Sequence, residues 1–125
     1  MNSPRRKELN RVVGGIGEDA AARELLRRGF RILERNHVCG GGELDIIAEK
    51  DGEIVFVEVK TRSPRAMAEP RAAVDADKQR RIKAAASYYL KRFRQPSPPR
   101  FDIVSVWIDS ADQVDRIELE CRAFE

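Results

Sequence analysis

The dipeptide Asp51-Gly52 lies between two runs of strand-forming residues, and this combination is the strongest short-range signal for a β-hairpin. The first run covers residues 43–50 and the second covers residues 53–61. A tight turn at the dipeptide pairs Lys50 with Glu53. That one pair fixes the register, and therefore decides which side chains of the two strands face each other.

This register brings two carboxylates together. Asp45 faces Glu58, and Glu43 faces Lys60 on the same side of the hairpin. Directly facing Cβ atoms lie about 4.5–5.5 Å apart, so like charges at facing positions destabilise the folded state. The strand around Glu58 is apolar on both faces, which is typical of a buried central strand. A charge that emerges from such a strand is costly unless it is paired or binds a metal ion.

Two interpretations of these facing acids fit the residues. In the first, Lys60 forms an ion pair with Glu58 or Glu43, and Asp45 is simply exposed at an edge. In the second, Asp45 and Glu58 bind Mg²⁺ or Mn²⁺, because both ions prefer oxygen ligands. Lys60 would then orient a water molecule or stabilise the charge that develops on phosphorus.

Positive charge is concentrated in one segment of the chain. Residues 60–100 contain 12 basic and 3 acidic side chains, a net charge of +9, whereas the whole chain carries +3. Arginine supplies 18 of the 24 basic residues, and its planar guanidinium suits phosphate. We therefore predict a nucleic-acid partner, held through its backbone without base readout. The predicted contacts are Arg62, Arg65, Arg71, Lys78, Gln79, Arg80 and Arg81.

The remaining pattern predicts the α/β class, with a mixed central β-sheet flanked by helices in the element order α-β-β-β-α-β-β. We expect helices over residues 18–28 and 75–93, and further strands over 30–37, 101–108 and 114–119. Asp75 or Asp77 can cap the start of the second helix. The glycines at 14, 15 and 17 predict a break in the chain. Residues 1–13 are accordingly expected to be a flexible basic tail, and residues 14–125 a single domain.

Several other features limit the class of protein. No apolar run approaches the length that spans a bilayer, and the N-terminus is too polar for a secretory signal, so we expect a cytoplasmic protein without a membrane partner. Two cysteines are too few for a disulfide framework or a four-ligand zinc site. Residues 39–42 are expected to be a flexible link. We expect Trp107 and Phe101 to be core or interface residues, not a base-stacking platform.

Asp45, followed by twelve residues and then Glu58-Val59-Lys60, resembles the D-(x)n-(D/E)-x-K signature of the PD-(D/E)XK nuclease superfamily. Glu18 resembles the helical acid of the branch similar to Holliday-junction resolvases. More narrowly, the chain resembles the uncharacterised bacterial YraN-like family over roughly residues 12–108. The motifs are Gly14-x-x-Gly17-Glu18-Asp19-x-Ala21, Gly29-Phe30-x-Ile32-Leu33, Arg35-Asn36, Gly42-Glu43-Leu44-Asp45-Ile46-Ile47, Phe56-Val57-Glu58-Val59-Lys60-Thr61-Arg62, Lys78-Gln79-x-Arg81 and Arg100-Phe101-Asp102.

The resemblance implies a nuclease-like core in which Asp45, Glu58 and the carbonyl of Val59 hold Mg²⁺ or Mn²⁺. Glu18 would complete the metal site through a water molecule, and Lys60 would orient the nucleophilic water. From its position alone, however, Glu18 is an acid in the first turn of a helix, where it suits the helix dipole.

The function that this resemblance implies is a divalent-metal-dependent, structure-selective DNA endonuclease of the Holliday-junction-resolvase-like type. A homodimer is expected only by analogy with resolvases. The alternative is a non-catalytic nucleic-acid-binding module, or an interaction subunit, that retains the nuclease fold, because a fold does not by itself establish an activity.

Overall fold

The structure is a computed structural model of the 125-residue chain, and it describes residues 4–64, 74–94 and 98–125. In chain order the elements are α1 (Pro4–Arg27), β1 (Arg31–Cys39), β2 (Gly42–Lys50), β3 (Glu53–Arg62), α2 (Ala76–Leu90), β4 (Arg100–Ile108) and β5 (Val114–Phe124). The strands form one sheet in the spatial order β1-β2-β3-β4-β5. Only β3 and β4 run parallel, and α2 lies in the crossover between them. The predicted α/β class with a mixed sheet is confirmed.

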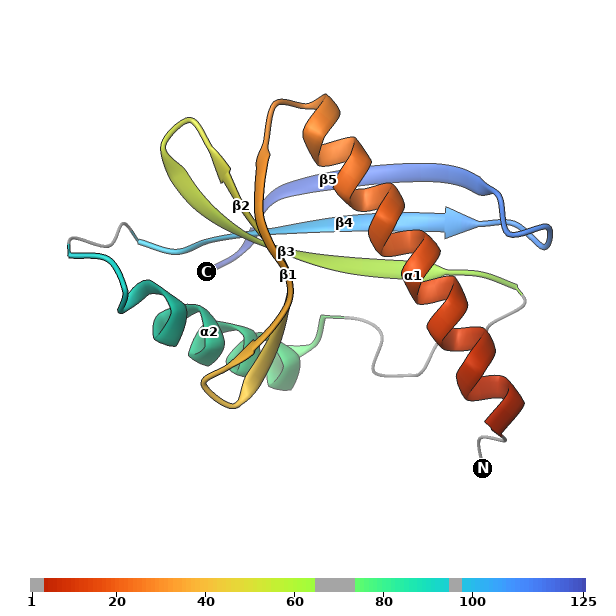
Figure 1. Cartoon of the computed structure of the whole chain (residues 1–125), viewed down its shortest axis with the longest axis horizontal. Coiled ribbons are helices and arrows are strands. Elements are labelled where there is room, and N and C mark those ends of the chain that lie inside the picture. The colour runs from red at the N-terminus through yellow and green to blue at the C-terminus, as the bar shows by residue number, and fades with distance from the viewer. Residues whose placement is uncertain (1–3, 65–73, 95–97) are drawn as a thin grey trace.

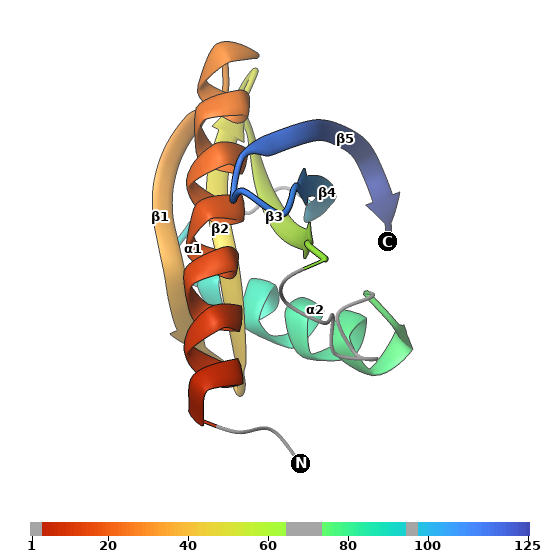
Figure 2. The same ribbon diagram turned by 90° about the vertical axis from the view of Figure 1, so that its right-hand side faces the viewer.

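The two helices pack on opposite faces of the sheet (Figures 1 and 2). On one face, Leu25 of α1 packs with Val55 and Val57 in what we call the α1 core. On the other, Ile82 of α2 packs with Phe56 in the α2 core. Successive side chains of a strand point to opposite faces, so the alternation along β3 explains the two cores. Helix α1 lies mainly over β3 and β4, whereas α2 lies over β1 and β2.

The hairpin predicted from Asp51-Gly52 is confirmed in its turn and its register. Strands β2 and β3 pair antiparallel from Lys50 with Glu53 to Ile46 with Val57. Both turn residues have positive φ angles, 51° and 82°, which is the backbone conformation that tight hairpin turns require.

The predicted N-terminal tail is wrong, because α1 already begins at Pro4 and continues through the glycines. Pro4 suits the start of a helix, where its missing N–H is not needed. Gly17 is buried where α1 crosses β3, and a Cβ atom there would lie 2.1 Å from Thr61 Oγ1. This glycine therefore serves close helix–sheet packing. The sequence suggested a break because glycine is also the usual residue of turns.

Two glycines of α1 are expected to respond to alanine in opposite directions. Gly15 is exposed and has no neighbouring atom that a methyl group would meet, so Gly15→Ala should raise the free energy of unfolding by about 0.5–1 kcal/mol. Gly17→Ala should lower it by about 1–3 kcal/mol, because the methyl group must displace Thr61. Urea denaturation of both variants measures this difference. Changes of the same sign would contradict the close packing of α1 on β3.

Other boundaries differ by a few residues from those expected. The segment predicted as a flexible link is a tight turn at Gly40 and Gly41, since β1 ends at Cys39 and β2 begins at Gly42. Helix α2 begins after Asp75, whose side chain accepts a hydrogen bond from the Lys78 N–H, as its predicted capping role requires.

Within the described ranges, no helix is long and apolar enough to cross a membrane. Both cysteines, Cys39 and Cys121, are free thiols.

Candidate functional site

A pocket of about 190 Å³ lies between β2, β3 and the first turns of α2. Asp45 and Glu58 both line it, so the two carboxylates lie on the same side of the sheet, as the hairpin register predicted. Helix α2 contributes Lys78 and Arg81 to the opposite wall. With Glu43, which also lines it, the pocket combines three acids and two cations that come from three separate elements.

Asp45 is held where the two strands of the hairpin stop pairing. The ladder of β2 and β3 extends to Ile46 and Val57, and next to it the Val59 N–H donates a 2.9 Å hydrogen bond to Asp45 Oδ2. The carboxylate therefore takes the place that a backbone carbonyl would fill in a continuous ladder. This contact fixes the side chain of Asp45 next to Glu58.

Glu58 is the most unusual group of the pocket. Its side chain is only 2% exposed, and neither carboxylate oxygen has a hydrogen-bond partner among the described residues. Burial raises the pKa of Glu58 to about 9, and the neighbouring Asp45 carboxylate contributes to the increase. Lys78 opposes this shift, since its Nζ lies 3.9 Å from Glu58 Oε2. Without a bound cation, Glu58 is therefore protonated at neutral pH.

The donor set fits a hard divalent cation. The ionised form of Glu58 is costly at this depth, and a cation placed between Glu58 and Asp45 would offset both its desolvation and its repulsion by Asp45. Among the described residues, no group of three or more His, Cys, Asp or Glu side chains converges on one point. Two carboxylates are nevertheless enough for Mg²⁺, which commonly takes one or two of them together with waters and substrate phosphates.

Glu18 does not line this pocket. Its carboxylate accepts hydrogen bonds from Arg35 Nε at 3.2 Å and from Asn36 Nδ2 at 2.8 Å, so it connects α1 to β1. Helix α1 also packs on the face of the sheet opposite to α2. A part for Glu18 in metal binding stays a prediction from the resemblance.

Lys78 is the lysine that lies close to the acids, whereas Lys60 does not line the pocket and shares only their side of the sheet. Lys60 is half-buried on β3, two residues after Glu58, and therefore faces the same side of the sheet. Lys78 is placed by the N-terminal cap of α2, because Asp75 Oδ1 accepts from its backbone N–H at 2.8 Å. The sequence predicted Lys78 only as a phosphate contact. Its proximity to Glu58 depends on how α2 docks on the sheet, and the local sequence around Lys78 does not predict that docking.

Among the described residues, the other predicted nucleic-acid contacts are divided between this pocket, a second pocket and the exposed surface of α2. Arg81 lines it, whereas Arg80 is exposed and pairs with Asp77 at 2.7 Å. Gln79 donates from Nε2 to the Val74 carbonyl at 3.2 Å, so its amide is used within the fold. Arg62 lies at a second pocket, at the carboxyl end of β3. Arg65 and Arg71 lie outside the described residues.

Close contact between α2 and the start of β2 determines the width of the pocket. A Cβ atom at Gly42 would lie 2.6 Å from the Arg81 carbonyl oxygen, so only glycine permits the observed separation. Both residues line the pocket, and glycine at this position therefore keeps Lys78 and Arg81 near the acids.

Fold and site together define an α/β domain with a five-stranded mixed sheet that carries two adjacent carboxylates on one face. The chain belongs to the uncharacterised protein family UPF0102, whose family model matches residues 17–106. That range includes both acids, Lys60 and the first turns of α2.

Similar members of this family come from several bacteria. A UPF0102 protein of Moorella thermoacetica is 46% identical over 112 residues, which cover 89% of this chain and 93% of the relative. One from Symbiobacterium thermophilum is 50% identical over 99 residues, covering 78% and 84% of the two chains. One from Geobacter sulfurreducens is 43% identical over 117 residues, covering 93% and 91%. The placement in the PD-(D/E)XK superfamily stays a prediction.

Proposed function

We propose that this protein is a divalent-metal-dependent endonuclease that hydrolyses phosphodiester bonds in DNA of branched or otherwise irregular structure. The observation that carries the proposal is the carboxyl group of Glu58, which is buried beside the Asp45 carboxylate and has a strongly raised pKa. A protein gains no stability from such an arrangement, and perturbed acids in a pocket are typical of functional sites.

In this proposal Asp45 and Glu58 hold Mg²⁺ or Mn²⁺. When bound, such an ion polarises a phosphoryl oxygen and lowers the pKa of a coordinated water. Lys60 orients the attacking water from the same strand as Glu58. Lys78 and Arg81 line the pocket from α2, across from the two acids, where they bind the phosphate and stabilise the charge that develops on it.

A screen of branched, flapped, single-stranded and duplex DNA with Mg²⁺ and with Mn²⁺ tests the proposal. Glu58→Gln and Lys60→Ala should each reduce the cleavage rate by about 100-fold or more, because each removes a group that acts on the reacting phosphate. The matched controls are Glu118→Gln and Lys91→Ala, whose side chains are exposed on β5 and directly after α2. These controls should cleave as the unmodified protein does.

Equal rates for Glu58→Gln and the unmodified protein would refute the assigned roles. Salt-sensitive binding without any product, whatever metal is supplied, would favour the non-catalytic nucleic-acid-binding module instead. The position of Lys78 favours that alternative, because its Nζ lies 3.9 Å from Glu58 Oε2 and can balance the charge of this carboxylate in place of a metal. The homodimer expected by analogy stays a prediction, which a sedimentation measurement decides.

A further inference from the structure

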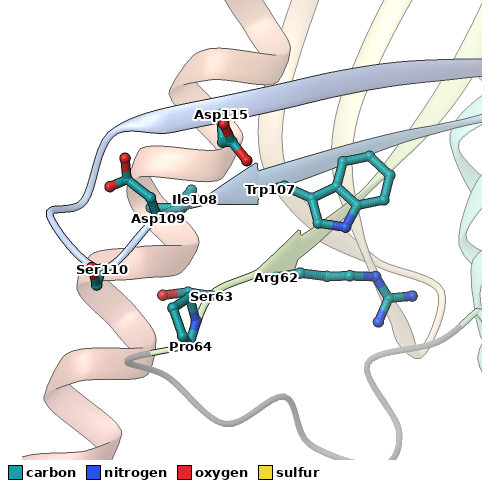
Figure 3. Close-up of a pocket in the computed structure, with 8 residues that line it drawn as sticks. All are labelled: Arg62, Ser63, Pro64, Trp107, Ile108, Asp109, Ser110 and Asp115. Carbon is teal, nitrogen blue, oxygen red and sulfur yellow. The ribbon is translucent and has the colours of Figure 1, made fainter.

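A second, larger pocket of about 560 Å³ lies where β3 and β4 end side by side (Figure 3). Arg62 is the last residue of β3, and Trp107 is its register partner on the parallel strand β4. The turn between β4 and β5 adds Asp109 and Ser110 to the lining, and β5 adds Asp115. The function proposed above makes no use of this pocket.

Arg62 and Trp107 face the same side of the sheet as the acid pair, although the pocket opens at the strand ends and is also lined by Ile108 of the α1 core. Val57 and Val59 of β3 contact the α1 core, so Glu58, Lys60 and Arg62 face the other side. The same alternation places Trp107 on that side of β4, because Val106 and Ile108 belong to the α1 core. Helix α2 lies mainly over β1 and β2, away from these strand ends.

Lys60 and Arg62 extend from the acid pair toward the second pocket. Residues that alternate on one face of a strand are about 6.6 Å apart, so Glu58 and Arg62 are separated by about 13 Å along β3. An extended nucleic-acid strand whose phosphate lies at Glu58 can follow these two cations along β3. A nucleotide a short distance from the cleaved bond would then reach Trp107.

The side chains that line this pocket suit a nucleobase better than a phosphate. Trp107 is half-buried, and the guanidinium of Arg116 lies 4.6 Å from its ring centroid, which holds the indole from β5. Arg62 is exposed and has no ion-pair partner within the described residues, so its charge is available to a sugar-phosphate backbone. Asp109 Oδ1 already accepts from the N–H groups of Ala111 and Gln113 within the turn, both at 2.9 Å. The carboxylates of Asp109 and Asp115 repel phosphate, but Asp115 and the second oxygen of Asp109 can accept hydrogen bonds from base amino groups.

We propose that the pocket of Trp107 and Arg62 binds an unpaired base of the DNA strand whose phosphodiester lies at Asp45 and Glu58. This inference rests on the proposed function and names its substrate class, which is DNA with unpaired nucleotides next to the cleaved bond. A base inside a duplex cannot stack on Trp107, because its faces are covered by its neighbours. The sequence predicted Trp107 to be a core or interface residue, whereas the structure leaves it facing a pocket.

Trp107 is the only tryptophan of the chain, so its fluorescence reports stacking directly. In EDTA, which prevents cleavage, a short single-stranded DNA should quench this fluorescence. The bound DNA should also reduce the further quenching of Trp107 by added iodide. A blunt duplex of the same sequence should bind through its backbone without either effect. Equal quenching by both DNAs, or none by the single strand, would overturn the proposal without any variant.

A substitution separates stacking from charge. Trp107→Ala should weaken single-strand binding by about 5- to 100-fold and leave blunt-duplex binding unchanged, whereas Trp107→Phe should retain most of the affinity. Tyr88→Ala is the matched control, because Tyr88 is an exposed aromatic residue on α2 outside both pockets. Equal loss for both DNAs in Trp107→Ala would contradict a base site.

The two proposals can fail separately. Quenching by single strands without cleavage of any DNA would refute the nuclease and retain the base pocket. Cleavage that does not discriminate between flapped and blunt DNA, and is unaffected by Trp107→Ala, would refute the base pocket and the structure selectivity but retain the metal-dependent nuclease.

Discussion

Glu58→Gln is expected to abolish most of the pH dependence of stability that the metal-free protein shows between about pH 5 and pH 9. The pKa of Glu58 is raised from 4.5 to about 9, so the folded state retains a proton that the unfolded state has lost in this range. The contribution of Glu58 to stability is therefore fully present below its pKa in the unfolded state, and it decreases as the pH rises toward 9. The decrease approaches about 1.4 kcal/mol per pH unit for one group. Glutamine has no proton to lose, so the variant should be nearly independent of pH.

Urea denaturation in EDTA at several pH values measures this effect, with Glu118→Gln as the exposed control on β5. Saturating Mn²⁺ should reduce the pH dependence of the unmodified protein, because a cation favours the ionised carboxylate. Manganese affinity should accordingly increase with pH, since binding releases the proton of Glu58. A pH-independent stability of the unmodified protein in EDTA would show that Glu58 is already ionised, and would remove the electrostatic argument for the metal.

Asp102→Ala is expected to lower the free energy of unfolding by about 3–5 kcal/mol, because it removes the nearest counter-charge of a nearly buried arginine. Arg100 then retains only the partly exposed Glu53, whose Oε1 lies 3.5 Å from its guanidinium. Asp102 is fully buried on β4 and accepts two hydrogen bonds from Arg100, at 3.0 and 2.9 Å. Its Oδ1 also accepts from the Arg122 N–H on β5 at 3.0 Å. This carboxylate raises the pKa of Arg100, whose side chain is only 10% exposed.

The matched control for this prediction is Glu118→Ala. Glu118 pairs with Arg116 at the same spacing of two residues along a strand, but both side chains are more than half exposed. An exposed pair contributes about 0–1 kcal/mol, so this variant should unfold almost as the unmodified protein does. Comparable losses for both variants in urea denaturation would mean that burial does not determine the value of the Asp102 pair.

The candidate site could be predicted from the sequence because its main geometry is local. The turn at Asp51-Gly52 fixes the register, and the register alone puts Asp45 and Glu58 on one side of neighbouring strands. Asp75 could be identified as a cap for the same reason, since capping involves residues three positions apart. In each case the physical cause acts within a few residues or across one hairpin.

Helix α1 shows where local reasoning fails. The glycines predicted a break, but Gly17 is required by Thr61, which is distant in the sequence and meets α1 only after the sheet has formed. The same holds for Lys78, which reaches Glu58 through the docking of α2, and for Trp107, which lies beside Arg62 through a parallel pairing. Such contacts depend on packing between elements.

The sequence by itself therefore determined the α/β class, the hairpin and the two facing acids, since alternation and turn chemistry are properties of short segments. Tertiary structure alone decided how deeply Glu58 is buried and that Lys78 is the cation next to it. It also decided that Glu18 contacts β1. Burial and charge pairing arise from surfaces that distant segments present to each other. They exist only once the two helices have packed on the sheet.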